Sequence, residues 1–160
     1  MTRALLLSVH PKFADRIFEG DKTAEVRRVR PSVSPGDLLC FYVSSPEKAL
    51  RGCALVDRVD AGGLGWLWRK VNGSTGLTSR EYGDYCRGAR AAYAIHFSCV
   101  QEFPAPVTLA DLRSLWSGFH PPQIYRYLSV REFGRLRQFL AGEGDAAISP
   151  LVLRLQTRDH

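Results

Sequence analysis

The order of apolar and polar residues predicts short strands that follow one amphipathic helix. Pro11–Glu19 carries apolar residues at helical spacing on one face, and Gly20 follows as a stop signal. Apolar stretches bounded by turn residues predict strands at Ala4–Val9, Ala24–Arg30, Leu38–Val43, Gly52–Asp60 and Ala92–Val100. Pro104 and Pro106 should end the last of them. The pattern indicates an α+β fold.

Two capping sequences predict later helices. Thr78–Glu81 has the S/T-x-x-E spacing of a capping box and predicts a helix over Ser79–Arg87. Ser129–Glu132 repeats this spacing and predicts a helix that ends at Gly142, and Leu151–Leu155 is a candidate final strand. Because a barrel hides strand edges, we expect the strands to form one curved sheet or a small mixed β-barrel, with short flanking helices.

Composition favours one domain over residues 1–160. The chain has 160 residues, of which 45% are apolar and 24% charged, enough for one core without disulfides. The longest apolar runs, Ala4–Leu7 and Leu38–Val43, are far shorter than the roughly twenty residues that span a bilayer. We therefore expect a cytoplasmic protein without a membrane partner.

The charge balance favours a polyanionic partner. Lys and Arg number 22 against 16 Asp and Glu, and Arg supplies 18 of these cations. Guanidinium groups bind phosphate and stack on bases. Genomic base composition also produces an arginine excess, so charge alone does not identify the partner.

The cysteines and histidines predict no metal site. Cys40, Cys53, Cys86 and Cys99 contain no C-x-x-C pair, and the histidines form no H-x-x-x-H pair. In strand-like apolar runs, Cys40, Cys53 and Cys99 should be small buried hydrophobes. We expect neither a metal nor another cofactor.

The segment that follows Gly20 concentrates charge beside a turn. Because strand side chains alternate, Glu25 and Arg27 share one face, and Lys22 in the preceding turn can lean toward them. Two cations and one carboxylate then converge in a compact polar site. The alternative is a surface ion pair among solvated arginines.

Gly20, Lys22, Glu25 and Arg27 reproduce the G-x-K-x-x-E-x-R signature, and in this the chain resembles the ASCH domain family over about residues 4–103. The resemblance implies a PUA-like β-barrel whose cleft binds RNA, with residues 104–160 as a helical C-terminal extension. Members are linked to transcription coactivation, RNA processing and translation. The tail that begins at Pro121 resembles that of small bacterial relatives described as predicted regulators.

The same resemblance leaves an enzyme possible, because some relatives are N4-acylcytidine amidohydrolases or ribonucleases. The amidohydrolase pattern has a threonine where this chain has Glu25, and this departure removes the expected nucleophile. In an enzyme, Lys22 would be a base or nucleophile assisted by Glu25 or Glu81. For Glu81, a role as the helix cap is the simpler explanation. A protein-interaction domain with a purely structural polar site is a third alternative.

The first hypothesis is a module that binds RNA, another single-stranded nucleic acid or a nucleotide. We expect a basic cleft around a partly exposed Lys22, with Tyr42 or Ser44 near its wall. The candidate binding residues are Lys22, Glu25, Arg27, Arg28, Arg30, Tyr42, Ser44, Ser45, Tyr125 and Arg126. Trp66 and Trp68 are further stacking candidates unless they are core residues. A second basic face lies in Arg131–Arg137.

Overall fold

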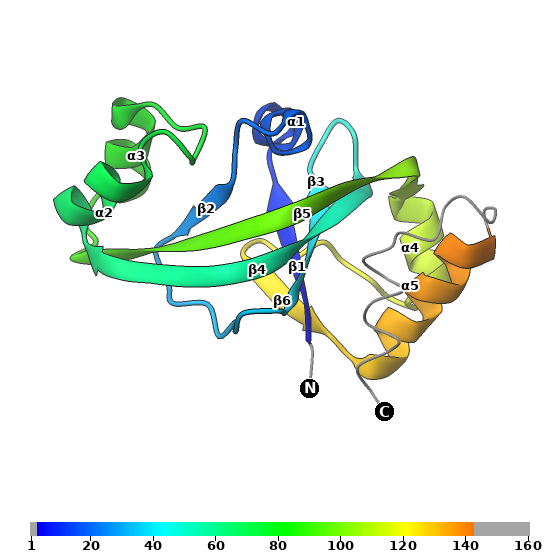
Figure 1. Cartoon of the computed structure of the whole chain (residues 1–160). Coiled ribbons are helices and arrows are strands. Elements are labelled where there is room, and N and C mark those ends of the chain that lie inside the picture. Colours follow the sequence, from blue (N-terminus) through cyan, green and yellow to red (C-terminus); the bar gives the residue numbers. More distant parts are fainter. Residues whose placement is uncertain (1–2, 143–160) are drawn as a thin grey trace.

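The computed structural model describes residues 3–142, which form six strands and five helices (Figure 1). The candidate strand Leu151–Leu155 lies outside the described residues. No helix in this part of the chain is long and apolar enough to cross a membrane. The elements are β1 (Ala4–Val9), α1 (Pro11–Glu19), β2 (Ala24–Arg27), β3 (Leu38–Val43), β4 (Ala49–Gly63), α2 (Leu64–Val71), α3 (Ser79–Tyr85), β5 (Ala91–Thr108), α4 (Leu109–Leu115), β6 (Tyr125–Leu128) and α5 (Val130–Gly142).

The strands form one mixed sheet in the order β2-β5-β4-β3-β1-β6. Only β1 and β3 pair in parallel, and the other neighbours are antiparallel. The α+β fold and its mixed sheet are as predicted. The sheet is not closed, because β2 and β6 are its two edges, so the expected barrel describes it only loosely.

Predicted and observed strands differ most in β4 and β5, which cross the whole molecule as a long ribbon (Figure 1). The prediction that Pro104 and Pro106 end a strand is wrong, because β5 continues to Thr108. The register jumps from Leu50 opposite Val107 to Gly52 opposite Glu102. The prolines lie in the irregular stretch between these pairs, where their missing N–H groups break no regular ladder.

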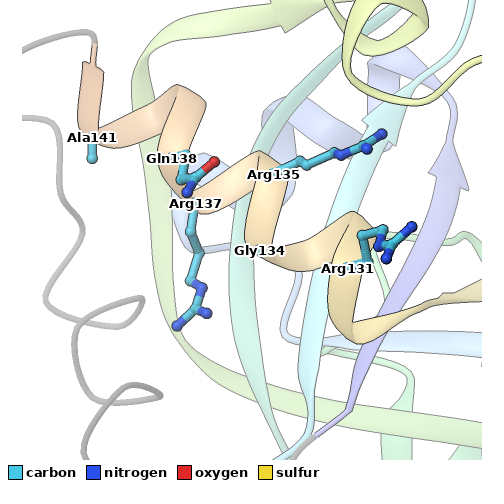
Figure 2. Close-up of a pocket in the computed structure, with 6 residues that line it drawn as sticks. All are labelled: Arg131, Gly134, Arg135, Arg137, Gln138 and Ala141. Carbon is cyan, nitrogen blue, oxygen red and sulfur yellow. The ribbon is translucent and has the colours of Figure 1, made fainter.

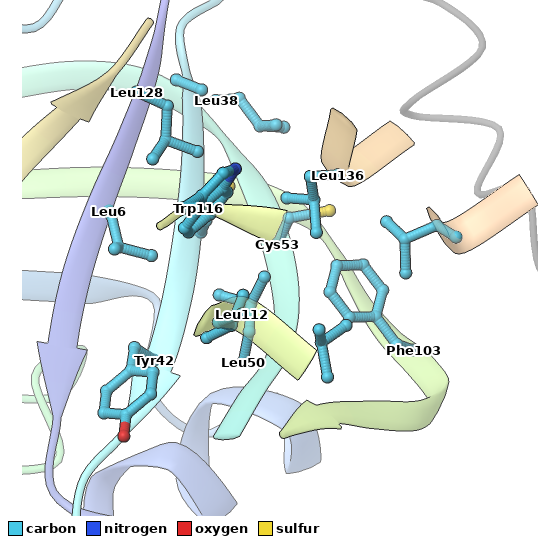
Figure 3. Packing of buried hydrophobic residues seen from close by; sticks show 14 of the residues in the cluster. Leu6, Leu38, Tyr42, Leu50, Cys53, Phe103, Leu112, Trp116, Leu128 and Leu136 are labelled. Atoms are coloured by element: carbon cyan, nitrogen blue, oxygen red, sulfur yellow. The ribbon is translucent and has the colours of Figure 1, made fainter. Parts of the chain in front are cut away.

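Strands β1 and β3 are buried on both faces. Leu5 and Leu7 pack with Phe41 and with Ile17 of α1, whereas Leu6 of the same strand faces the opposite way. That opposite face packs against α4 and α5, as Figure 3 shows for Leu6, Tyr42, Leu112 and Leu136. Two-sided burial explains why the central strands are continuous apolar runs in the sequence.

Three short elements were not predicted: α2, α4 and β6. Leu67 and Val71 bury one face of α2, and Trp68 stacks on Tyr82 of α3 with ring centroids 4.7 Å apart. Helix α4 begins with a capping box made by Thr108 and Asp111. The aspartate replaces the glutamate of the two predicted boxes, so a search for S/T-x-x-E passes over it.

One cysteine differs from expectation. Cys40, Cys53 and Cys86 are buried, but Cys99 is exposed. Its backbone has φ +54°, in the left-handed region that non-glycine residues seldom adopt. The prediction of a buried Cys99 is wrong because this local irregularity interrupts the strand alternation on which it depended.

Candidate functional site

The signature begins where α1 ends. Gly20 adopts φ +90°, and its backbone N–H bonds back to α1 as the C-cap. No atom lies within 4 Å of where a Cβ would stand, so the left-handed backbone and not a lack of space favours glycine here. The chain then turns, and Thr23 and Ala24 both donate to the Ser74 carbonyl between α2 and α3. The signature loop is thereby tied to the connection that leads into α3.

Lys22 is the centre of this connection. Its Nζ donates to the carbonyls of Thr75 at 2.6 Å and Ala24 at 3.0 Å, and it lies 3.5 Å from Glu25 Oε2. Only 2% of the residue is exposed. The expectation of a partly exposed Lys22 is therefore wrong: its cation joins two segments of the protein and has few donors left for a ligand.

Glu25 lies between two cations. Its Oε2 faces Lys22, and its Oε1 lies 3.6 Å from Arg27 Nη2. Oε2 is buried and has no hydrogen-bond partner, since the ion pair with Lys22 lacks hydrogen-bond geometry. A buried carboxylate with an unused acceptor is costly unless a further donor reaches it.

Arg27 bridges the open side of the sheet. Its Nη1 donates to the Ile124 carbonyl at 3.1 Å and its Nη2 to the Ser8 carbonyl at 3.3 Å. Pairing between β1 and β6 ends at Leu7 and Tyr125, so Ser8 and Ile124 are the next residues beyond that ladder. A guanidinium fork from edge strand β2 thus spans the gap that strand pairing leaves open.

A pocket of about 450 Å³ opens on this gap, and we call it the motif pocket. It reaches Lys22, Glu25 and Arg27 together, so the structure converges the three side chains that strand alternation placed on one face. Its lining residues are Ser8, Val9, His10, Phe13, Lys22, Glu25, Val26, Arg27, Leu77, Glu81, Asp84 and Tyr85. Neither Tyr42 nor Ser44 is among them, contrary to expectation.

The charge of the motif pocket is mixed. Lys22 and Arg27 are opposed by the carboxylates of Glu25, Glu81 and Asp84. The expected basic cleft is therefore not what lines this pocket. Polar groups beside apolar walls suit a flat ligand that carries hydrogen-bonding groups along its edge better than they suit a bare phosphate.

Glu81 caps the start of α3, and the contacts that it makes there explain its lowered pKa. Its Oε1 accepts from the Thr78 backbone in a complete capping box, and its Oε2 lies 3.1 Å from Lys12 Nζ. The Thr78 backbone hydrogen bond and then the Lys12 ammonium lower the pKa of Glu81 to about 2. A carboxylate with so low a pKa is a weak base at neutral pH.

A second hollow of about 430 Å³, which we call the edge pocket, adjoins the first. The two pockets share Arg27 and Tyr85. The edge pocket is lined by Arg27, Arg28, Val29, Tyr85, Ala89, Gln123 and Ile124. Arg28 therefore lies at a pocket, as a binding residue should, whereas Arg30 is exposed and lines neither pocket.

The remaining candidates lie elsewhere. Tyr42 is 2% exposed and packs against Phe119, with ring centroids 6.3 Å apart. It shares its strand face with Cys40, in the cluster under α4 and α5 (Figure 3). Ser44 and Ser45 occupy the turn after β3 and line neither pocket. The structure does not bring these three residues to the signature.

Tyr125 and Arg126 are adjacent in β6 and point to different neighbours. The Tyr125 ring packs edge-on against Tyr127 at 6.2 Å. The Arg126 guanidinium pairs with Glu132 of α5 and lies 5.5 Å from the Phe119 ring centroid. Neither side chain lines the two pockets, although Ile124 immediately before them does.

Sequence reasoning missed two aromatic residues of the motif pocket, Phe13 and Tyr85. Tyr85 is 41% exposed. Burial raises the pKa of its hydroxyl, with Arg27 acting in the opposite direction. The sequence did contain a signal for Tyr85, because this residue lies four positions after Glu81 in the predicted helix and so shares its face. Figure 1 shows β2 between α1, which carries Phe13, and α3.

A third hollow, of about 470 Å³, follows α5 (Figure 2). It is lined by Arg131, Gly134, Arg135, Arg137, Gln138 and Ala141. This is the second basic face expected from the sequence, and in Figure 1 α5 lies at the opposite end of the sheet from α2 and α3. Across residues 3–142, no group of three or more His, Cys, Asp or Glu side chains is arranged to hold a metal ion.

Comparison with known proteins identifies the family. The ASCH domain model matches residues 7–100. An ASCH domain-containing ribonuclease from Zymomonas mobilis is 29% identical over 131 residues, which are 82% of this chain and 88% of the relative. The crystal structure of ASCH from Zymomonas mobilis is 28% identical, with a TM-score of 0.80 over 83% of this chain and 92% of that one.

A more distant match shows how widely the fold occurs. The human THYN1 protein, solved in complex with DNA that contains 5-methylcytosine, has a TM-score of 0.52. It is 15% identical and covers 84% of this chain and 95% of its own, so the likeness is one of fold alone. Together with the family match over residues 7–100, the fold and the signature place this chain in the ASCH domain family.

Proposed function

We propose that this protein binds single-stranded RNA and holds one nucleotide of it in the motif pocket. The observation that carries the proposal is the Glu25 carboxylate, which lines a pocket of about 450 Å³, keeps 15% of its side chain exposed and is held by ion pairs with Lys22 and Arg27. An exocyclic amino group of a base can donate to the exposed part of this carboxylate. Phe13 and Tyr85 line the same pocket and offer aromatic faces for stacking.

Lys22 and Arg27 have a different task in this proposal from the one their charge suggests. Both are buried and donate to backbone carbonyls, so they position Glu25 through its two ion pairs while making little direct contact with the ligand. The exposed Arg28, at the adjoining edge pocket, supplies the phosphate contact. RNA is the favoured polymer because the Zymomonas mobilis relative is named as a ribonuclease.

The experiment compares two carboxylate variants in fluorescence anisotropy with a labelled single-stranded RNA. Glu25→Gln should weaken binding about tenfold, because a hydrogen bond to a charged group contributes about 1.5–3 kcal/mol. Glu102→Gln is the control, since Glu102 is an exposed carboxylate that pairs with Arg51 outside both pockets. Equal affinity for the Glu25→Gln variant and the wild type would contradict the proposal.

Ribonuclease activity is the second candidate, favoured by the same relative, which matches most of both chains. His10 is exposed and lines the motif pocket. Its Nδ1 accepts the Lys12 backbone N–H, so in the neutral ring the proton lies on Nε2. Nε2–H can then donate to a phosphate oxygen and stabilise the charge that develops there.

In this reaction the ribose 2′ oxygen attacks the adjacent phosphorus and the bond from phosphorus to the 5′ oxygen breaks. Water takes the 2′ proton and another water protonates the 5′ oxygen, which leaves a 2′,3′-cyclic phosphate and a 5′ hydroxyl. Lys22 is a poor nucleophile here because its donors are engaged with carbonyls. Glu81 is a poor base because its pKa is about 2.

Cleavage is tested on a labelled RNA in the presence of a chelator. His10→Ala should lower the rate by about 10²–10³, the usual effect of removing one donor to a developing oxyanion, while RNA binding persists. His120→Ala is the control, because His120 is exposed and lines neither pocket. Cleavage that is equally fast in both variants would exclude His10 from the reaction.

A further inference from the structure

We infer that the edge pocket is a second nucleotide subsite, so that the smallest complete ligand of this protein is a single-stranded dinucleotide. The inference rests on the proposed function and deepens it, because a mononucleoside would fill the motif pocket alone. The two pockets adjoin through Arg27 and Tyr85. Consecutive nucleotides of one strand can therefore occupy them in turn.

The first observation is where the exposed apolar side chains gather. Five large hydrophobic residues are exposed in the described part of the chain, and three of them line the edge pocket. These are Val29, Tyr85 and Ile124, which are 59%, 41% and 53% exposed. Single exposed hydrophobics need no explanation, but a cluster at one hollow marks a binding surface.

The second observation is the polar groups of the same pocket. Arg28 is an exposed cation, and Gln123 offers an exposed amide that can both donate and accept. Apolar surface for a base, a cation for a phosphate and an amide for a base edge fit a second nucleotide next to the first.

The third observation is that the walls are held in place by the strands. Ser8 Oγ donates to the Pro122 carbonyl at 2.5 Å, and Arg27 donates to the Ile124 carbonyl at 3.1 Å. The segment that carries Gln123 and Ile124 is therefore anchored on both sides before any ligand arrives. Such preorganisation lowers the entropic cost of binding.

A strand of nucleic acid fits this surface better than a polypeptide does. The hollow shares Arg27 and Tyr85 with the motif pocket, where the partly exposed Glu25 carboxylate suits a base edge. An apolar protein partner would leave the Arg28 guanidinium without an anionic counterpart. A contact with a second copy of this chain is an outcome that the experiment separates.

The experiment compares cytidine 5′-monophosphate with the dinucleotide CpC, both 2′-O-methylated to prevent cleavage, by isothermal titration calorimetry. CpC should bind at least about tenfold more tightly, since a stacked base contributes about 1–3 kcal/mol. Ile124→Ala should weaken CpC by about three- to tenfold and leave the mononucleotide unchanged. Val130→Ala is the matched control, because Val130 is also an exposed apolar residue and lies on α5, outside both pockets.

The two proposals fail in different ways. Equal affinities for the two probes, with no effect of Ile124→Ala, would overturn the second subsite while the first nucleotide site stands. Absence of binding by either probe to the wild-type protein would overturn both. Sedimentation analysis gives the third arm: if the wild type is a dimer and Ile124→Asp makes it a monomer, the edge pocket is a protein interface and the subsite is wrong.

Discussion

The signature segment has two halves that use the same kinds of charge differently. From Lys22 to Arg27 the charged side chains are buried or partly buried, and they bond to carbonyls or pair with one another. From Arg28 to Arg30 the chain is exposed, and only Arg28 and Val29 reach a pocket. A cluster of cations in a sequence therefore does not by itself indicate a phosphate-binding surface, because half of this one holds the fold together.

The difference follows from what each half packs against. The first half lies between α1, the Ser74–Gly76 connection and the paired strand β5, where carbonyls without other partners are available. The second half begins where β2 ends, so its side chains have no neighbouring strand to meet. Burial of a cation is tolerated only where several acceptors surround it.

The largest expected effect comes from the buried half. Lys22→Ala removes the donor to Thr75 and Ala24 and leaves Glu25 facing Arg27 alone. Breaking a buried ion pair from one side costs about 3–5 kcal/mol, so the free energy of unfolding should fall by that amount in urea denaturation. Lys70→Ala, an exposed lysine of α2, is the control and should change it by less than about 0.5 kcal/mol. If Lys22→Ala lowers the free energy of unfolding by less than about 1 kcal/mol, the buried half of the segment contributes no more to stability than the exposed half does.

Arg27→Ala should have the next largest effect on the free energy of unfolding. Together with Arg27→Lys, it separates the effect of the bridging hydrogen bonds from the effect of the positive charge alone. The variant loses two hydrogen bonds to the carbonyls of Ser8 and Ile124, which at about 1–1.5 kcal/mol each predicts a loss of about 2–3 kcal/mol. Hydrogen exchange in residues 121–128 should accelerate, because this segment loses its anchor to β2. Arg27→Lys keeps the charge but not the fork and should restore little of the protection. Full protection in the lysine variant would indicate that charge alone is sufficient.

The sequence predicted this arrangement in part, and its limits have physical reasons. Strand alternation placed Glu25 and Arg27 on one face, and the structure confirms that both line one pocket with Lys22. Alternation does not say how deeply a side chain is buried, however, and the burial of Lys22 depends in part on the Thr75 carbonyl, which is more than fifty residues away in the sequence. The same limit applies to Tyr42, whose strand face is covered by α4, a helix that the sequence analysis did not predict.

The overall fold was more predictable than the closure of the sheet. The bounds of β1, α1 and β3 follow from local apolar patterns and stop signals, and the structure reproduces them. Whether edge strands β2 and β6 pair depends on the path of the entire chain, and β6 is only four residues long. A side chain of Arg27 bridges the gap instead, and no local pattern distinguishes it from the exposed Arg28 that follows.

The exposed half should govern binding and not stability. Arg28→Ala should weaken binding of single-stranded RNA by about tenfold and reduce the slope of affinity against salt by about one, as expected for one phosphate contact. Arg30→Ala is the matched control, an exposed arginine two residues away that lines neither pocket. Anisotropy titrations between low and moderate salt measure both quantities. If the two variants lose affinity equally, the phosphate contact is not localised at the edge pocket, and the general positive charge of this segment accounts for it.

The smallest expected effect concerns Glu81, which lies at the solvent side of the same motif pocket and tests how much an exposed carboxylate contributes there. The Thr78 backbone hydrogen bond and Lys12 lower its pKa from 4.5 to about 2. A carboxyl group whose folded pKa is depressed stabilises the fold above its unfolded pKa, and this stabilisation is lost as the pH falls through the folded value. The melting temperature of the wild type should therefore exceed that of Glu81→Gln by a small margin at pH 6, and the margin should shrink between pH 4.5 and about 2. Glu19→Gln, at an exposed position of α1, is the control for a general charge effect. A margin in melting temperature that stays constant from pH 6 to pH 2 would mean that the charge of the Glu81 carboxylate does not stabilise the start of α3. The ion pair with Lys12 would then contribute nothing measurable to stability, and only the buried charges around this pocket would stabilise the fold.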